Sequence, residues 1–510
     1  MYKYAVFTKK NITLHCKLTF NTHNLMFSKE TYIQRRNVLR ELVGNGVIVL
    51  FGNNESPCNY PNNGYSPFRQ DSSFLYYFGI QEIGLIGVID CESGEEWLLG
   101  NDVDVEDIVW YGSVPTISDL AASVGVKNSA PWKKIEDIVS DAKKTQRKIH
   151  FLPPYRHDIM IQIMDLMGIH PYAQREAASM ELINAVIKMR SVKTAEEIEE
   201  IERACNIGYE MHTLAMRLTR PGRTEKYIGG RIDGIAHALG AHESFATIFS
   251  QHGEIMHGCP STNLLEDGRI VICDSGAETV NNYCSDNTRT LPVNGKFTQR
   301  QKEIYNIVDE CHDLTLEISK PGVKYMDVHF AVARRMTERL KELGLMKGDV
   351  DEAVAAGAHA MFFPHGLGHM MGMDVHDMEG FNQIYVGFDE ETRPMLDQFG
   401  TNCLRMGRRL EEGFVVTDEP GIYETDEVGI RIENELMCVH KADNQYGTFL
   451  GFEPLMFVPI ATSPILPGVL DRDEIAWLND YHRQVFAKLA PHLNDAERVW
   501  LAEKCAAISC

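Results

Sequence analysis

Apolar and polar positions in the first third of the chain alternate with two different periods. Residues 32–43 (YIQRRNVLRELV) have the spacing of an amphipathic helix, and residues 46–52 (GVIVLFG) form a short apolar run bounded by glycine, as in a buried strand. Residues 74–80 (FLYYFGI) and 83–90 (IGLIGVID) are also predicted to be strands. Helical and strand patterns go on alternating up to residue 154, so we expect an α/β domain.

Longer helical patterns begin after residue 190. Thr194 is followed three residues later by Glu197, which is the signature of a capping box at the start of a long helix. A second helical pattern follows at residues 225–240, and short strand patterns come after it. The same order of two helices and then sheet segments recurs from residue 301, which suggests an internal duplication without a residue-level repeat.

These patterns divide the chain into four parts. Residues 1–28 have mixed charge and weak periodicity and are expected to be a disordered leader. Residues 29–178 are expected to form the α/β N-terminal domain, and residues 179–464 a larger α+β domain. Residues 465–510 are predicted to be a helical C-terminal extension. The apolar residues predicted to pack this extension are Trp477, Leu478, Tyr481, Val485 and Leu489.

Composition restricts the class of protein. A chain of 510 residues with 44% hydrophobic and 24% charged residues can bury large cores, which excludes a small binding module, wholesale disorder and a fibrous repeat. Its formal net charge of −22 repels phosphate backbones and anionic lipids, so neither nucleic acid nor a membrane is an expected partner. Its 12 scattered cysteines and the lack of a secretory signal or long apolar run favour a cytoplasmic protein.

The first group of residues with chemical potential lies in a predicted hairpin. Asp274 ends the apolar strand before the turn, Asn281 and Asn282 are turn formers, and Asp286 lies on the returning strand. If the pairing is centred on Val280, the two carboxylates face each other with Cβ atoms about 4.5 to 5.5 Å apart. Like charges so close are unfavourable unless a cation lies between them, although both residues can also serve as turn formers.

Three histidines form the second group. His365, His369 and His376 occur together in a segment rich in glycine. The segment is not the HExxH motif of zinc proteases, because Gly366 takes the place of the glutamate, and its glycines disfavour a regular helix. A single buried histidine is often an ordinary core residue, whereas three in one bend indicate a site.

Two glutamates form the third group. Glu419 closes one apolar strand, and Glu433 is predicted to lie inside another, with Arg431 on the same strand face two residues earlier. A glutamate in so apolar a strand is costly unless it is paired or bound to a metal. Arg431 alone can provide that pairing, so Glu433 considered singly also has a purely structural explanation.

Together the three groups suit hard or borderline cations. The set contains four carboxylates and one imidazole: Asp274, Asp286, His369, Glu419 and Glu433. Four carboxylates nearly cancel the charge of two divalent ions, and oxygen-rich ligation favours Mn²⁺. Two such ions about 3.5 to 4 Å apart can hold a bridging hydroxide as nucleophile and stabilise the oxyanion that forms when it attacks an amide.

The sequence resembles the pita-bread metallopeptidases, the family that includes aminopeptidase P, prolidase and methionine aminopeptidase. The resemblance covers about residues 31–505 and depends on four segments in this order: SDNTRTLPVNGKF, HGLGHMMGMDVHD, EPGIY and GIRIEN. It implies that residues 179–464 form a catalytic domain with the pita-bread (creatinase/aminopeptidase-type) fold. Retention of all five ligand positions speaks against a relative that keeps this fold only as a non-catalytic protein-binding module.

The resemblance implies a role for each ligand. Asp286 and Glu433 are similar to the carboxylates that bridge both metals, and Asp274 is similar to the chelator of one metal. His369 and Glu419 are similar to the ligands of the other metal. Glu419 is also similar to the residue that acts as base towards the metal-bound water.

The resemblance also implies roles for four neighbours of the ligands. His376 matches the histidine that contacts the scissile carbonyl, His365 the histidine near the proline-binding side, and His257 another histidine on the substrate side. Arg431 looks like a residue that is not itself a metal ligand but holds the ligand Glu433 in place.

The sequence departs from the family pattern at two places. Asp274 and Asp286 are 12 residues apart, one more than is usual, and we expect the extra residue to lengthen the hairpin loop without moving either ligand. In the N-terminal segment RQDSSFLYYFG, Ser73 stands where an acidic residue often precedes the aromatic one, and Asp71 is the candidate substitute.

Within the family, the N-terminal domain argues against methionine aminopeptidase. Aminopeptidase P and prolidase remain, and both cut the Xaa-Pro bond. The tail FEPLMFVPI and its following helices resemble the C-terminal extension of Xaa-Pro aminopeptidases. We therefore expect removal of the N-terminal residue from peptides with proline second, with a dipeptidase (prolidase) as the alternative. The resemblance also implies a homodimer or homotetramer.

Overall fold

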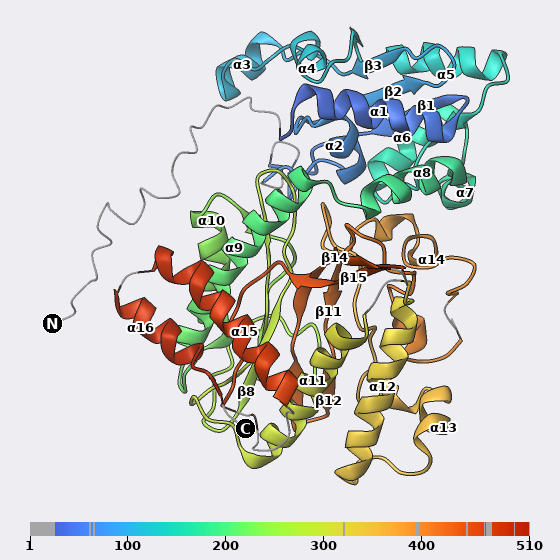
Figure 1. Ribbon diagram of the computed structural model, residues 1–510. Helices are drawn as coiled ribbons and strands as arrows, with labels where there is room; N and C mark the ends of the chain where they lie inside the picture. Colours follow the sequence, from blue (N-terminus) through green and yellow to red (C-terminus); the bar gives the residue numbers. More distant parts are fainter. Residues whose placement is uncertain are drawn as a thin grey trace. The chain divides into compact units, whose positions relative to one another are not determined.

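The computed structural model describes residues 26–508, apart from residues 61–62, 65–66, 320–321, 394–396, 445–446, 464, 466–471 and 494. Most of the leader predicted for residues 1–28 lies outside the described residues. The chain forms two compact units, of which the first runs up to Phe151 and includes Ile161–Ile169 (Figure 1). The second unit contains Leu152–Met160 and the chain from His170 onward. The chain passes from one unit to the other at three points between residues 151 and 170, which lie before the boundary that we predicted after residue 178.

The first unit is built on a five-stranded sheet. Its strands are β1 (Val47–Phe51), β2 (Ile86–Asp90), β3 (Glu96–Leu99), β4 (Asn128–Ala130) and β5 (Ile149–His150). Its helices are α1 (Lys29–Val43), α2 (Ser72–Phe78), α3 (Val105–Tyr111), α4 (Ile117–Ser123) and α5 (Lys134–Lys144), and α6 (His157–Met167) has residues in both units. The strand order is β4-β3-β2-β1-β5, with β1 antiparallel to β2 and parallel to β5. Ile135, Val139 and Ala142 of α5 pack against apolar residues of β1, β2 and β3, so the predicted α/β domain is confirmed.

Helix α2 corrects one prediction, because its sequence FLYYFGI was expected to be a strand. Asp71 caps the helix by accepting a hydrogen bond from the backbone N–H of Phe74 at 2.9 Å, and Gly79 ends it in the left-handed region with φ of 63°. All seven residues of the helix are buried. A segment buried on every side has no polar face, and its period therefore could not be recognised in the sequence.

The second unit contains longer helices and several short sheets. Its α-helices are α7 (Pro171–Ala177), α8 (Met180–Ser191), α9 (Ala195–Leu218), α10 (Glu225–Ala238), α11 (Gln299–Ile318), α12 (Tyr325–Glu342), α13 (Val350–Ala355), α14 (Gln383–Val386), α15 (Arg472–Leu489) and α16 (Asp495–Lys504). Its strands are β6 (His242–Glu243), β7 (Ile248–Ser250), β8 (Ile270–Asp274), β9 (Ala277–Glu278), β10 (Thr288–Pro292), β11 (Val415–Asp418), β12 (Gly421–Glu424), β13 (Val428–Arg431), β14 (Asn434–Asn444) and β15 (Gly447–Pro454). Strands follow the pair α9–α10 directly, whereas α13 and α14 come between the pair α11–α12 and β11.

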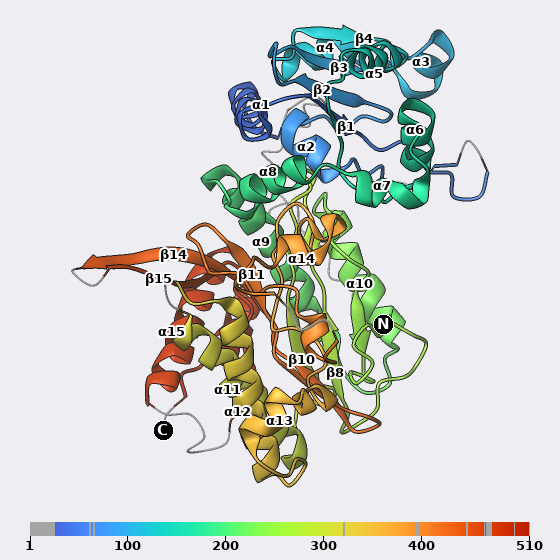
Figure 2. The same ribbon diagram turned by 90° about the vertical axis from the view of Figure 1, so that its right-hand side faces the viewer.

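Four antiparallel groups of strands carry the irregular segments of this unit. The orders are β10-β8-β7, β11-β14-β15, β12-β13 and β6-β9, and β14 and β15 form a long ribbon (Figure 2).

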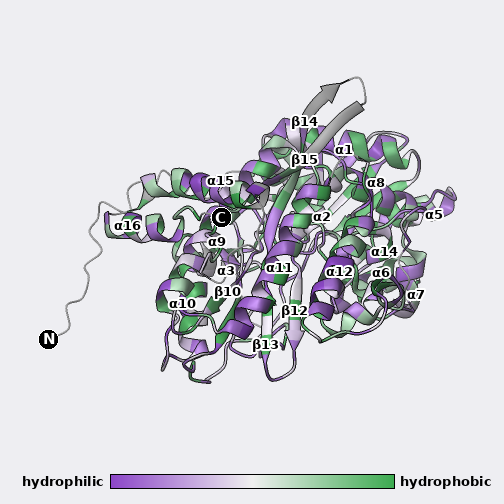
Figure 3. Ribbon diagram, turned by 60° about the horizontal axis from the view of Figure 1, so that its bottom comes forward, coloured by the Kyte–Doolittle hydropathy of each residue, from purple (hydrophilic) through white to green (hydrophobic). Residues whose placement is uncertain are grey.

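The helices bear hydrophilic and hydrophobic residues side by side, as expected for amphipathic helices (Figure 3). Among the described helices, none combines the length and the apolar composition that a membrane span requires.

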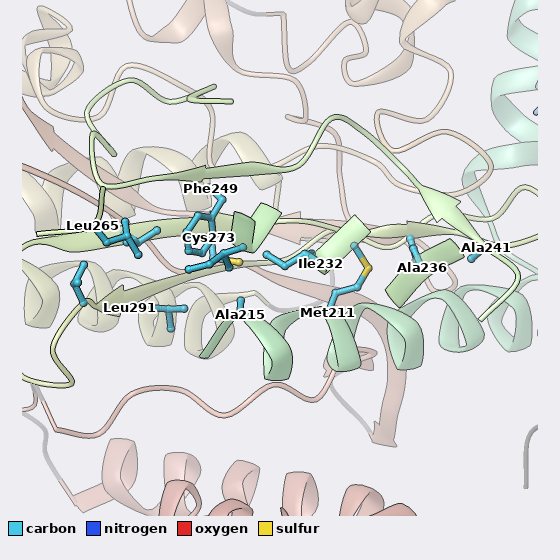
Figure 4. Close-up of a cluster of buried hydrophobic side chains, with 13 residues drawn as sticks. Met211, Ala215, Ile232, Ala236, Ala241, Phe249, Leu265, Cys273 and Leu291 are labelled. Carbon is cyan, nitrogen blue, oxygen red and sulfur yellow. The ribbon is translucent and has the colours of Figure 1, made fainter. Parts of the chain in front are cut away.

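Helices α9 and α10 pack on the sheet formed by β7, β8 and β10. The predicted capping box begins α9: Thr194 accepts a hydrogen bond from the backbone N–H of Glu197, whose side chain accepts one in return. Met211 of α9, Ile232 of α10 and Cys273 of β8 belong to one buried apolar cluster (Figure 4). This core supports β8, which ends at Asp274, and β10, which begins two residues after Asp286.

The hairpin that carries Asp274 and Asp286 differs in register from the prediction. β8 pairs with β10 so that Asp274 lies opposite Thr288, which centres the hairpin one residue beyond Val280. The register shifts because the left-handed position of the turn falls on Asn282, with φ of 61°. The two aspartates are therefore not direct cross-strand partners, and Asp286 extends from irregular backbone before β10.

The predicted helical extension is confirmed as α15 and α16. Leu478, Tyr481 and Val485 of α15 are buried, and the ring of Trp477 stacks on that of Tyr481 with centroids 5.5 Å apart. The extension therefore packs through the apolar residues that the sequence indicated.

Two adjacent glycines of α10 test how tightly this helix packs. A Cβ atom on Gly229 would lie 2.5 Å from Cγ of Pro260, whereas one on Gly230 would meet nothing within 4 Å. Gly230→Ala should stabilise the protein by about 0.5 to 1 kcal/mol, since alanine is the better helix former, and Gly229→Ala should destabilise it by about 1 to 3 kcal/mol through overpacking. Urea unfolding midpoints of the two variants check this, and shifts in the same direction would contradict it.

Candidate metal centre

The five predicted ligands come from five places in the second unit. Asp274 ends β8, and Asp286 lies two residues before β10. Glu419 directly follows β11, as expected. Glu433 lies in the two-residue connection between β13 and β14, so the prediction that it lies inside a strand is wrong. His369 lies in an irregular segment whose backbone is hydrogen-bonded to β11.

Three of these residues form a close group. One ligand atom each from Asp286, His369 and Glu433 lies within 4.8 Å of the other two. Nε2 of His369 is 3.4 Å from Oδ2 of Asp286 and 3.8 Å from Oε1 of Glu419. Asp286 is 5% exposed and Glu433 is 2% exposed. The structure thus gathers carboxylate oxygens around one imidazole nitrogen, away from water.

Asp274 has one satisfied oxygen and one unsatisfied oxygen. Its Oδ2 accepts a hydrogen bond from Nη2 of Arg431 at 2.6 Å. Its Oδ1 is buried and has no hydrogen-bond partner among the described residues. An orphaned carboxylate oxygen in the interior is costly, and a cation is the natural partner for it. The donor set therefore fits a metal site.

The pKa shifts of the carboxylates also indicate that this group needs a positive charge close by. Burial, followed by repulsion from Asp274 and Glu419, raises the pKa of Asp286 well above its usual value. Burial and repulsion from Asp286 and Glu419 do the same to the pKa of Glu433. Burial opposes ionisation of Glu419, but the neighbouring histidines, led by His365 and His369, together with Arg431 outweigh it and lower the pKa of Glu419. A bound cation would allow all these carboxylates to be ionised together.

The tautomer of His369 suits metal binding. Its Nδ1 lies 3.1 Å from the backbone carbonyl oxygen of Met370. Because a carbonyl oxygen only accepts, Nδ1 carries the proton and Nε2 keeps its lone pair. Burial lowers the pKa of His369, which favours the neutral ring. The nitrogen that faces the carboxylates is therefore the one that can bind a cation.

Three consecutive residues after Asp286 hold Glu433 in place. Nδ2 of Asn287 and Nη1 of Arg289 donate to the backbone carbonyl oxygen of Glu433 at 2.6 and 2.7 Å. The hydroxyl of Thr288 donates to Oε2 of the Glu433 side chain at 2.6 Å. Sequence reasoning did not assign these roles, although all three residues lie in the segment that carried the resemblance.

Arg431 contacts more than the predicted partner. Its Nε is 3.9 Å from Oε2 of Glu433, so the expected pair is present, but its shortest contact is the bond to Asp274. Nε also donates to the hydroxyl of Thr288 at 2.9 Å, and Nη1 donates to the hydroxyl of Tyr423 at 2.8 Å. Arg431 thus connects two predicted ligands with a tyrosine.

Tyr423 continues this connection to His365. Nδ1 of His365 lies 2.8 Å from the carbonyl oxygen of Gly366 and so carries the proton, which leaves Nε2 to accept from the Tyr423 hydroxyl at 2.8 Å. Nδ1 of His365 is also 3.7 Å from Oε2 of Glu419. The sequence reasoning missed Tyr423, although its place in EPGIY, four residues after Glu419, was a usable signal.

His376 lies beside His369, with ring centroids 4.0 Å apart. Its Nδ1 donates to Oε2 of Glu379 at 2.7 Å, and Oε1 of Glu379 accepts from Nε of Arg405 at 2.8 Å. Burial opposes ionisation of Glu379, but its bonds to His376 and Arg405 lower its pKa to about 2. The pair Glu379–Arg405 was not found from the sequence, and only the position of Glu379 three residues after His376 indicated it.

His257 lies in an exposed turn of the connection between β7 and β8. Its neighbour Met256 packs against a small cluster made by Ile248, Ile272 and Tyr423. The turn is therefore anchored next to the tyrosine that contacts His365. No direct contact joins His257 to the predicted ligands among the described residues.

Comparison with known proteins gives matches over nearly the whole described chain. The sequence model of metallopeptidase family M24 matches residues 199–440, that of the aminopeptidase P N-terminal domain residues 32–150, and that of the C-terminal region of peptidase M24 residues 448–508. An Xaa-Pro aminopeptidase of Escherichia coli (strain K12) is 31% identical over 430 residues, which are 80% of this chain and 92% of that protein. An Xaa-Pro dipeptidase of Mus musculus is 29% identical over 420 residues, 77% of this chain and 80% of that protein.

Solved structures agree with these sequence matches. The zinc-substituted E. coli aminopeptidase P in complex with product has a TM-score of 0.69 and 27% identity, and the match covers 92% of this chain and 100% of that chain. Proline aminopeptidase P II from Yersinia pestis has a TM-score of 0.69 and 28% identity, over 89% of this chain and 99% of that chain. The expected fold, an α/β N-terminal domain followed by a pita-bread catalytic domain and a C-terminal extension, is thus confirmed, and the chain belongs to metallopeptidase family M24.

Proposed function

We propose that this protein is an Xaa-Pro aminopeptidase, which removes the N-terminal residue from peptides that have proline second. The observation that carries the proposal is the buried group of Asp286, His369 and Glu433, which lies beside the orphaned Oδ1 of Asp274 in an M24 chain. The similarity to E. coli Xaa-Pro aminopeptidase over 92% of that protein supports the substrate class.

The ligand set supports two divalent cations, with Mn²⁺ as the first candidate. Asp286 and Glu433 would contact both ions, Asp274 would bind one, and His369 and Glu419 the other. Oxygen-rich ligation with a single imidazole suits Mn²⁺ better than a structural zinc site. When bound, such a pair supplies activation of water and stabilisation of negative charge on the carbonyl oxygen.

Glu419 and His376 would handle the protons of the reaction. The lowered pKa of Glu419 keeps its carboxylate ionised, so it can accept a proton from the attacking water and pass it to the proline nitrogen. Burial and His369 lower the pKa of His376, and Glu379, which accepts from Nδ1, opposes that shift. A protonated His376 would donate from Nε2 to the carbonyl oxygen as it becomes negative. His365 and His257 are proposed to contact the peptide on either side of the bond.

The main alternative is an Xaa-Pro dipeptidase, since such enzymes are also among the relatives. The match of residues 448–508 to the C-terminal region of peptidase M24 accords with the resemblance of the tail to that of Xaa-Pro aminopeptidases. A non-catalytic protein-binding module has no support from the site, because all five ligand types are present and buried or partly buried. A homodimer or homotetramer in the cytoplasm stays a prediction.

Glu419→Gln should abolish most of the activity. The amide cannot accept the proton, and loss of a general base costs about 10² to 10⁴ in rate. The measurement is hydrolysis of an Xaa-Pro tripeptide at saturating Mn²⁺, with metal content determined on the same sample. Glu424→Gln, which changes a partly buried glutamate on β12, is the matched control. Near-normal turnover by Glu419→Gln would reject Glu419 as the base.

Metal removal tests the proposed cofactor. Protein purified without added ions should contain between one and two transition-metal ions per chain by elemental analysis. Prolonged dialysis against a chelator should abolish activity, and Mn²⁺ should restore it, since the buried carboxylates need the positive charge. Less than one ion per chain together with no activation by Mn²⁺ would contradict a dimetal enzyme.

Peptide length separates the aminopeptidase from the dipeptidase. We expect hydrolysis of Xaa-Pro-Yaa tripeptides with a kcat/KM at least ten times that for the matching Xaa-Pro dipeptides. Peptides with alanine in place of proline serve as the control for the substrate class. Cleavage of dipeptides alone would identify a dipeptidase.

A further inference from the structure

Glu225, the first residue of α10, closes a loop of residues 251–261, which is the part of the connection between β7 and β8 that carries His257. Its Oε1 accepts hydrogen bonds from the hydroxyl of Ser250 at 3.1 Å and from the backbone N–H of Gln251 at 2.9 Å. Its Oε2 accepts from the backbone N–H of Ser261 at 3.2 Å and from the Ser261 hydroxyl at 2.6 Å. One carboxylate thus holds both ends of the same loop.

The chemistry of Glu225 matches this task. The residue is 0% exposed, and it forms no ion pair among the described residues. A buried carboxylate needs several donors to compensate for lost hydration, and here all four come from the two ends of the loop. A glutamine could keep one pair of these bonds, but in either orientation its NH₂ group would face a backbone N–H, that of Gln251 or that of Ser261.

The end of the loop at Ser261 is also joined to α10 by backbone hydrogen bonds. Lys226 donates its N–H to the carbonyl oxygen of Ser261 at 2.7 Å, and Glu225 donates its N–H to the carbonyl oxygen of Asn263 at 3.1 Å. Gly229 lies so close to Pro260 that a Cβ atom there would be 2.5 Å from the proline ring. The helix and the end of the loop therefore form one tightly packed piece.

The loop also contacts β12 and β13, the strands that carry Tyr423 and Arg431. A Cβ atom on Gly429 of β13 would lie only 2.0 Å from the carbonyl carbon of Gly253, so the two backbones touch. Met256 packs on the cluster that includes Tyr423, whose hydroxyl binds Nε2 of His365 at 2.8 Å. The residue after Met256 is His257, so His257 follows directly on a residue that packs against Tyr423.

We propose that Glu225 is a positioning residue for the peptidase reaction, because it closes the loop that presents His257 to the peptide substrate. The proposal depends on the proposed function, since His257 has a task only if the protein binds a peptide there. Glu225 touches neither substrate nor metal, and it acts through the loop alone.

A double-mutant cycle tests this proposal. Glu225→Gln should lower kcat/KM for an Xaa-Pro-Yaa tripeptide about tenfold, chiefly by raising KM, with metal content unchanged. Ser261→Ala should act in the same direction but more weakly, and it guards against a folding defect in Glu225→Gln. When His257→Ala is already present, adding Glu225→Gln should change kcat/KM less than twofold. Full additivity, or loss of metal from Glu225→Gln, would overturn the proposal.

A control variant and a second measurement distinguish closure of the loop by Glu225 from the proposed peptidase activity. Glu310→Gln removes a buried glutamate of α11 that pairs with Arg339 at 3.1 Å, and it should leave kcat/KM unchanged. Backbone amide exchange in the peptide covering residues 251–261 should be faster in Glu225→Gln than in the wild type and Glu310→Gln. Unchanged amide exchange would show that Glu225 does not close the loop. If the wild type cleaved no Xaa-Pro peptide, the proposed function would fail, while faster exchange would still establish that Glu225 closes the loop.

Discussion

Mutual repulsion among buried carboxylates is the constraint on which the second unit depends. Asp274, Asp286 and Glu433 lie in one dry region with Glu419 next to them, and burial together with their neighbours' charges raises the pKa of the first three. A protein interior does not keep such a set ionised without positive charge close by. Divalent cations supply that charge, so metal binding and the stability of this region are expected to be coupled.

The surrounding scaffold keeps the carboxylates in place by hydrogen bonds to groups that are neutral or positive. Glu433 is bound at its backbone and at its side chain by the segment Asn287–Arg289, while Arg431 binds Asp274 and supports Glu433 through Thr288. These contacts join β10, β13 and the start of β14. The backbone beside Asp274, Asp286 and Glu433 is therefore fixed by strands that are far apart in sequence.

The sequence was most informative where a charged residue interrupts an apolar strand or a glycine-rich bend. Asp274 at the end of β8 and Glu419 after β11 were located correctly for that reason. The helix α2 was mistaken for a strand because all of its residues are buried, which removes the alternation that distinguishes the two. Glu225 gave no signal, since its partners Ser250 and Ser261 lie 25 and 36 residues away in the chain.

By itself the sequence determined the order of elements, the two kinds of domain, the residue types of the ligand set and the family resemblance, because periodicity and motif spacing are local properties of the chain. Only the tertiary structure decided the register of the hairpin, the place of Glu433 between two strands, the division of Arg431 between Asp274 and Glu433, and the link from His365 through Tyr423. The bond between Arg431 and Asp274 joins residues 157 positions apart, that between His365 and Tyr423 joins residues 58 positions apart, and the hairpin differs by a shift of one residue in pairing. Local patterns in the sequence do not specify such contacts or the pairing register. Many partners can satisfy the same buried donor or acceptor, and only the packed core selects one of them.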